Sequence, residues 1–186
     1  MENNNFYTYG MIKPDAMEHK EEILKMIYEA GLEVHYMEYD NLTDEIIEEN
    51  YSHCIGKDFY PGMKENLQSG PVLKMLIYDK SGSAVLNYRK VLGATKSKEA
   101  LPNTIRGRFG NKEITYKNAA HGSGNEKEAN DEIIRFFKDS MQDLLAKVRI
   151  SGEYQFNDKF YVDIDLDSKL MIAKALYKGK VNKKGE

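Results

Sequence analysis

The sequence predicts an α+β sandwich, in which helices pack against a β-sheet. Segments 6–13, 32–39 and 72–78 are rich in aromatic and aliphatic residues and predict strands. Between and after them lie segments whose apolar residues recur at helical spacing. The two kinds of element interleave along the chain with a hint of antiparallel order, and this arrangement favours the sandwich.

The limits of the strands follow from single residues. The first strand ends at Pro14, because proline cannot donate a hydrogen bond to a neighbouring strand. In the second strand, apolar and polar residues alternate, so that Leu32, Val34 and Tyr36 are expected on one face of the sheet.

The predicted helices cover residues 20–30, 43–51, 63–68, 83–92 and 125–138. In the first, Ile23, Ile27 and Ala30 share one face. Thr43 is a suitable N-cap for the second helix. Gly93 is expected to end the fourth, since glycine adopts the backbone conformation common after a helix.

The chain divides into two parts. Residues 1–140 are expected to form one domain, within which residues 94–120 show little periodicity, as is common in functional segments. Residues 141–186 are a C-terminal extension, with a helix from Ser140 and a strand over residues 160–166. Residues 150–186 number fewer than the ~40 that a chain usually needs to fold alone, so we expect the extension to pack on the core or on a neighbouring subunit.

Composition excludes several classes of protein. The 186 residues are 41% apolar and carry a formal net charge of -3, with a pI of about 5.9. This balance is typical of a soluble domain and shows no basic excess for nucleic acid. No apolar run approaches the ~18 residues of a membrane span, and the single cysteine, Cys54, precludes an intrachain disulfide. We therefore expect a cytoplasmic protein.

One histidine has a suggestive environment. Small residues surround His121 in the segment AAHGSG, which leaves its ring accessible, although a lone histidine is more often structural. Glu132 lies between Ala129 and Phe136 on the apolar face of its helix, and a buried carboxylate needs a partner. It either forms a salt bridge or accepts a hydrogen bond from one nitrogen of His121, which leaves the other nitrogen as a nucleophile. Ser123 is expected to bridge to Glu132 or to cap the helix, and its Ser-x-x-Glu spacing fits a capping box.

Several cations are candidates for binding an anionic substrate. Lys13 follows a strand, Arg89 lies off the apolar stripe of its helix, and Arg106 falls in the irregular region near Thr95. Each alone is more simply a surface charge. Together they suit phosphate, to which arginine offers two hydrogen bonds and lysine a point charge.

Five motifs in order now suggest a family. They are IKPD from Ile12, SGPV from Ser69, LGAT from Leu92, PNTIRG from Pro102 and HGS from His121. Over roughly residues 6–138 the sequence resembles the nucleoside diphosphate kinase family. The resemblance implies a ferredoxin-like α/β sandwich with a four-stranded antiparallel sheet.

The resemblance also implies roles for individual residues. The catalytic set comprises the phosphorylated His121, its orienting partners Glu132 and Ser123, and Lys13 and Tyr51. The nucleotide-binding set comprises Lys13, Phe59, Met63, Arg89, Thr95, Arg106 and Asn118. Phe59 is expected to stack on the base, Asn118 to contact the ribose, and the arginines and Thr95 to contact the phosphates.

The implied reaction is ping-pong transfer of the γ-phosphate from an NTP to an NDP through a phosphohistidine. Nucleoside tri- and diphosphates would be the partners, and Mg²⁺ would arrive on their phosphates, because few carboxylates lie in the motifs. The protein is expected to be a homo-oligomer. A nucleotide-binding regulatory module with little kinase activity is the alternative. An RNA-binding sheet would need paired aromatics and a basic face, and neither is evident.

Overall fold

The structure is a computed structural model that describes residues 5–140, 149–150 and 154–155. Four strands form its main sheet: β1 (Tyr7–Ile12), β2 (Glu33–Asp40), β3 (Val72–Tyr78) and β4 (Ala120–Gly122). Their order is β2-β3-β1-β4 and every neighbouring pair is antiparallel. The α+β, ferredoxin-like sandwich predicted from the sequence is therefore confirmed.

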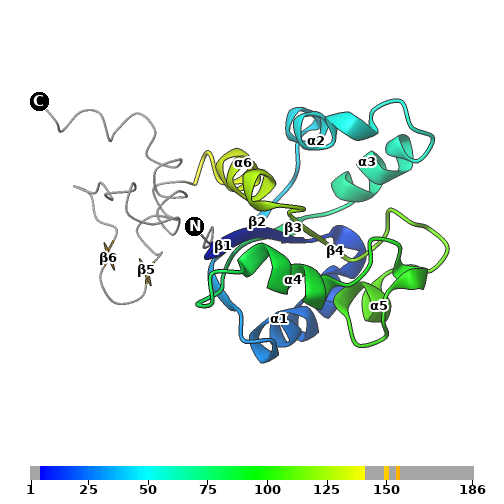
Figure 1. The fold of residues 1–186 in the computed structure, drawn as a ribbon. Coiled ribbons are helices and arrows are strands. Elements are labelled where there is room, and N and C mark those ends of the chain that lie inside the picture. Colours follow the sequence, from blue (N-terminus) through cyan, green and yellow to red (C-terminus); the bar gives the residue numbers. More distant parts are fainter. Residues whose placement is uncertain (1–4, 141–148, 151–153, 156–186) are drawn as a thin grey trace, which may run out of the picture.

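Helices cover both faces of this sheet (Figure 1). On one face lie α2 (Asp44–Asn50), α3 (Tyr60–Gln68) and α6 (Glu126–Phe136), and on the other lie α1 (Lys20–Glu29), α4 (Ala84–Leu92) and α5 (Ile105–Phe109). Short 3₁₀ helices lie at Pro14–His19, Ser52–Cys54 and Ser97–Glu99. Each layer contributes its own apolar cluster, so β1 and β3 are buried on both sides.

The fourth strand begins at the last residue of the segment expected to be irregular, and no strand was predicted there. Most of segment 94–120 is loop, with α5 capped by Thr104, but β4 begins at Ala120 and pairs with β1 over three residues. A strand this short carries no readable period. It places His121 directly opposite Met11 of the central strand β1.

The alternation in the second strand predicts the wrong face for Tyr36. The pairing of β2 with β3 shifts register between Val34 and Tyr36. Consequently Leu32 and Val34 join the apolar cluster under α1, whereas Tyr36 joins the cluster under α6. A bulge inserts one residue and turns the following side chains to the other face, which alternation alone cannot reveal.

Several helix limits also differ from the sequence prediction. Helix α3 begins three residues early, at Tyr60, because Pro61 in the first turn suits a helix start. The cap of α6 is Asn125, whose side chain accepts from the Glu128 N–H, so the capping box at Ser123 was wrong. Ala30 lies just past the end of α1 and is exposed.

Little of the C-terminal extension can be compared with expectation. Two short strands, β5 (Arg149–Ile150) and β6 (Tyr154–Gln155), pair with each other. The helix expected from Ser140 and the strand over 160–166 lie outside the described residues. In the part of the chain that is described, no helix is long and apolar enough to cross a membrane.

A buried lysine ties the end of α6 to the sheet. Lys74 on β3 donates to the Phe136 carbonyl at 2.7 Å and pairs with Glu38 at 2.8 Å and Asp40 at 2.9 Å, both on β2. The Lys74 side chain is only 5% exposed, so these three acceptors provide the hydrogen bonds that water would otherwise provide. Helix α6, which carries Glu132, is thereby fixed over β2 and β3.

We expect Lys74→Met to lower the free energy of unfolding by about 2–4 kcal/mol, because it leaves the Phe136 carbonyl and two partly buried carboxylates without their cation. Denaturant titration monitored by circular dichroism would measure the loss. Lys127→Met is the matched control, since Lys127 pairs with Asp131 in an exposed position and should contribute little. Equal effects of the two substitutions would contradict the role given to Lys74.

Candidate functional site

A cavity of about 1050 Å³ opens between the ends of these elements. Its walls come from the end of α2 and the segment after it, the start of α3, one face each of α4, α5 and α6, and the loop before β4. All but one of the residues singled out in the sequence line it: Lys13, Tyr51, Phe59, Met63, Arg89, Thr95, Arg106, Asn118, His121 and Glu132. The exception is Ser123, which is buried behind the wall and contacts Glu132.

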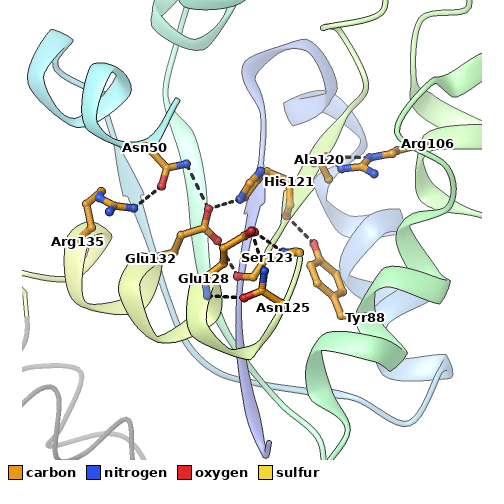
Figure 2. A network of polar contacts seen from close by, with 11 residues as sticks. Asn50, Tyr88, Arg106, Ala120, His121, Ser123, Asn125, Glu128, Glu132 and Arg135 are labelled. Atoms are coloured by element: carbon orange, nitrogen blue, oxygen red, sulfur yellow. Dashed lines mark hydrogen bonds and ion pairs between the residues drawn. The ribbon is translucent and has the colours of Figure 1, made fainter. Parts of the chain in front are cut away.

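The contact expected between His121 and Glu132 is present (Figure 2). His121 Nε2 lies 2.7 Å from Glu132 Oε1. An ionised carboxylate can only accept, so Nε2 carries the proton and Nδ1 holds a lone pair. Nδ1 has no hydrogen-bond partner among the described residues. The ring packs between Tyr9 and Tyr51, with both centroid separations 5.9 Å.

Glu132 is held at both of its oxygens. Ser123 Oγ donates to Oε2 at 2.6 Å, and Asn50 Nδ2 donates to Oε1 at 3.2 Å. Burial raises the pKa of Glu132, but the His121 ring and these donors outweigh it and hold the pKa below its ordinary value. The carboxylate therefore stays ionised, and it remains an acceptor for His121 near neutral pH.

The backbone around His121 is also fixed. The Tyr88 hydroxyl on α4 donates to the His121 carbonyl at 3.3 Å. A Cβ at position 122 would lie 2.7 Å from the Tyr88 ring, so glycine is what lets this ring approach β4. Arg106 donates through Nε and Nη2 to the Ala120 carbonyl, at 3.2 and 3.1 Å.

Lys13 occupies the buried end of the cavity. Its Nζ donates to Asn118 Oδ1 at 2.6 Å and to the Tyr116 carbonyl at 3.1 Å. Burial lowers the pKa of Lys13 to about 8, with Arg106 acting in the same direction and Asp15 opposing. A lysine in this condition gains from an anion that replaces lost solvation.

A strained turn joins Asn118 to β4. Ala119 has a φ of 68°, a left-handed conformation that costs a non-glycine residue about 1–2 kcal/mol. Asp15 Oδ2 accepts from the Ala119 N–H at 3.0 Å, and its other oxygen accepts from Asn66 on α3 at 2.8 Å. The turn aims Asn118 at Lys13 while β4 aims His121 into the cavity.

The other predicted phosphate ligands differ in how firmly their side chains are held. The Arg106 guanidinium also donates to the Gly93 carbonyl, which leaves one N–H on each of its terminal nitrogens. Arg89 and Thr95 are exposed along the cavity wall. Arg106 thus supplies a fixed positive charge, and Arg89 supplies an adjustable one.

At the open end, Phe59 is 42% exposed and Met63 is buried behind it. An exposed ring is available to stack on a planar ligand, while Met63 packs into the core under α3. Tyr51 is buried beside His121, and burial raises the pKa of its hydroxyl.

Three contributors to the site escaped the sequence reading. Asp15 was quoted only as part of a motif, while Asn50 and Arg135 were not singled out at all. Asn50 ends a helix next to Tyr51, and Arg135 follows Glu132 by three positions. Helical spacing could have paired Arg135 with Glu132, but nothing in the sequence brings Asn50 to them.

Comparison with known proteins gives consistent results. A sequence profile described as nucleoside diphosphate kinase matches residues 7–141. A nucleoside diphosphate kinase of Streptococcus pneumoniae is 38% identical over 138 residues, covering 70% of this chain and 98% of that protein.

Solved structures agree as well. The apo nucleoside diphosphate kinase of Encephalitozoon cuniculi is 32% identical with a TM-score of 0.68, and covers 83% of this chain and 97% of its own. The Halobacterium salinarum enzyme, solved in complex with CDP, is 26% identical with a TM-score of 0.67, and covers 87% of this chain and 97% of its own.

Because the pKa of Lys13 is lowered in the folded chain, the free energy of unfolding depends on pH. Between about pH 8 and the ordinary lysine value of 10.5, the unfolded chain holds a proton on Lys13 that the folded chain has released. Stability from this group therefore rises with pH across that window. As pH increases from 7.5 to 9.5, we expect the free energy of unfolding of the wild type to rise relative to that of Lys13→Met. Urea titrations of both proteins would measure this difference. A constant difference would show that the Lys13 pKa is not lowered.

Proposed function

Because the chain belongs to the nucleoside diphosphate kinase family, whose members are transferases, we propose that it moves the γ-phosphate of an NTP to an NDP through phosphorylated His121. The observation that carries this proposal is the pairing of His121 Nε2 with the buried Glu132, which leaves the Nδ1 lone pair unengaged in a cavity bordered by cations.

The first half-reaction uses that lone pair. Nδ1 attacks the γ-phosphorus while the bond to the bridging β-oxygen breaks, and the NDP leaves with those electrons. The ring then carries the phosphoryl group on Nδ1 and its proton on Nε2, so it becomes cationic, and Glu132 stabilises that charge. A terminal phosphate oxygen of a second NDP then attacks the phosphorus and releases the neutral ring.

The remaining residues position the phosphates. Phosphoryl transfer depends mainly on alignment and on charge stabilisation. Lys13 and Arg106 supply charge at the buried end of the cavity, while Arg89 and Thr95 border the open side. We assign Asn118, whose Oδ1 accepts a hydrogen bond from Lys13 Nζ, to the ribose hydroxyls, as the family resemblance implies.

Mg²⁺ fits this proposal as a companion of the substrate. Among the described residues, no group of three or more histidine, cysteine, aspartate or glutamate side chains could hold a metal ion. Glu128, which borders the cavity, is already bonded to the Gly124 and Asn125 nitrogens. Phosphate oxygens of the nucleotide would thus be the main ligands of Mg²⁺, and the ion would neutralise part of their charge.

The open end favours broad base acceptance. Stacking on Phe59 would depend on the π-face that every base shares. The CDP bound by the Halobacterium salinarum relative agrees with a diphosphate substrate. We further propose that the protein is a cytoplasmic homo-oligomer. The exposed Met37 and Tyr39 on the edge strand β2 support self-association.

We expect γ-labelled ATP to label His121, and the label to be acid-labile and base-stable, as phosphoramidates are. Gel analysis of the wild type and of His121→Ala would measure it, and unlabelled NDP should remove the label as NTP. A label that persists in His121→Ala would contradict the proposal. Binding of nucleotide without labelling would favour the regulatory module.

Glu132 provides a second test. Glu132→Ala frees the His121 ring to turn, and should slow phosphorylation by about 10–10³-fold. Glu132→Gln keeps an oxygen near Nε2, so it should lose less. Nucleotide affinity should change little in either variant, because Phe59, Lys13 and Arg106 remain. Single-turnover rates and equilibrium binding would separate the two effects, and wild-type rates in Glu132→Ala would leave Glu132 a merely structural carboxylate.

A further inference from the structure

Two residues of the cavity wall, to which the proposed reaction gives no role, contact each other. They are Asn50, the last residue of α2, and Arg135 of α6. We infer that Asn50, oriented by Arg135, is a positioning residue that holds Glu132 against His121. This inference deepens the proposed function and rests on it.

The contacts form a continuous series (Figure 2). Arg135 Nη1 donates to Asn50 Oδ1 at 2.7 Å, and Asn50 Nδ2 donates to Glu132 Oε1 at 3.2 Å. The same Oε1 accepts from His121 Nε2 at 2.7 Å. Arg135 also forms an ion pair with the exposed Glu49, whose Oε1 lies 3.0 Å from the Arg135 Nε.

The series fixes the direction of the Asn50 amide. Arginine has donors only, so the Asn50 atom that faces Arg135 must be the oxygen. An ionised carboxylate has acceptors only, so the Asn50 atom that faces Glu132 must be the nitrogen. Without Arg135, the amide could rotate and place its oxygen against the carboxylate, which would repel Glu132 from its present position.

This restraint bears on the reactive nitrogen. Glu132 reaches from α6 to a histidine on β4, and a swing of its side chain would release Nε2. Ser123 restrains Oε2, but Oε1, the oxygen that touches His121, is restrained only by His121 itself and Asn50 among the described residues. Asn50 thus acts on the oxygen that sets the tautomer of the ring.

The competing interpretation is that the contacts only join α2 to α6. If the contacts are only structural, the substitutions would lower the melting temperature, and any losses in phosphorylation rate and in nucleotide affinity would be of similar size. A positioning role predicts a slower phosphorylation step at unchanged nucleotide affinity, and a mixed His121 tautomer before any nucleotide is added.

The test uses the full chain with the substitutions Asn50→Leu, Asn50→Asp, Arg135→Gln and Arg135→Lys. Arg108→Gln is the matched control, since Arg108 pairs with Glu22 in an exposed position away from the cavity. For each variant, single-turnover phosphorylation by ATP, ADP affinity and the ring-nitrogen chemical shifts of ¹⁵N-histidine-labelled protein would be measured.

We expect Asn50→Leu to slow phosphorylation about 10-fold, within the range for a positioned contact, with ADP affinity within about twofold. Asn50→Asp should lose more, because it places a second carboxylate against Glu132. Arg135→Lys should retain more rate than Arg135→Gln, because it keeps a donor-only group beside Asn50. The double variant Asn50→Leu/Arg135→Gln should be no slower than Asn50→Leu alone, because the two residues act in series.

Rates within twofold of wild type in Asn50→Leu would overturn the inference, as would additive losses in the double variant. A wild-type protein that forms no phosphohistidine would sink the proposed function instead. In that case the ¹⁵N shifts still decide the positioning claim. A single Nε2–H tautomer in wild type and a mixture in Asn50→Leu support it, and identical spectra contradict it.

Discussion

The site depends on one buried carboxylate. Glu132 is 5% exposed, and an ionised group at that depth persists only if donors replace water. Three residues donate hydrogen bonds to it. They are His121 on β4, Ser123 directly after β4, and Asn50 at the end of α2. Because the carboxylate accepts from Nε2, it leaves Nδ1 for chemistry. In the proposed reaction, the interaction that stabilises this buried charge is therefore also the one that prepares the nucleophile.

The end of the cavity that we propose binds phosphate also holds a buried charge. Burial removes water from the Lys13 ammonium and destabilises its charged form, which lowers its pKa. Hydrogen bonds to Asn118 and to the Tyr116 carbonyl offset only part of this loss. The strained Ala119 turn, tied to Asp15, holds this arrangement in place. An anion bound beside Lys13 would compensate for the solvation that this lysine has lost, while the turn keeps Asn118 and Lys13 together.

Much of this could be predicted from the sequence, and the failures have physical causes. Period and composition identified the three long strands, and helical spacing showed that Glu132 would point into the core. The three-residue strand β4 was missed because it is too short to show a period, and the bulge near His35 was missed because alternation continues through it. Asn50 and Asp15 were overlooked because their partners lie 82 and 104 residues away. Such distances are set by topology, which local patterns do not encode.

The central claim is that Glu132 selects which nitrogen of His121 reacts. NMR of protein carrying ring-¹⁵N histidine, recorded after phosphorylation by ATP, would locate the phosphorus directly through its coupling to nitrogen. Phosphorus coupled to Nδ1 of His121, with the proton retained on Nε2, is the result that this geometry requires. Phosphorus coupled to Nε2 would mean that the contact with Glu132 breaks before the reaction, and would contradict the role assigned to the carboxylate.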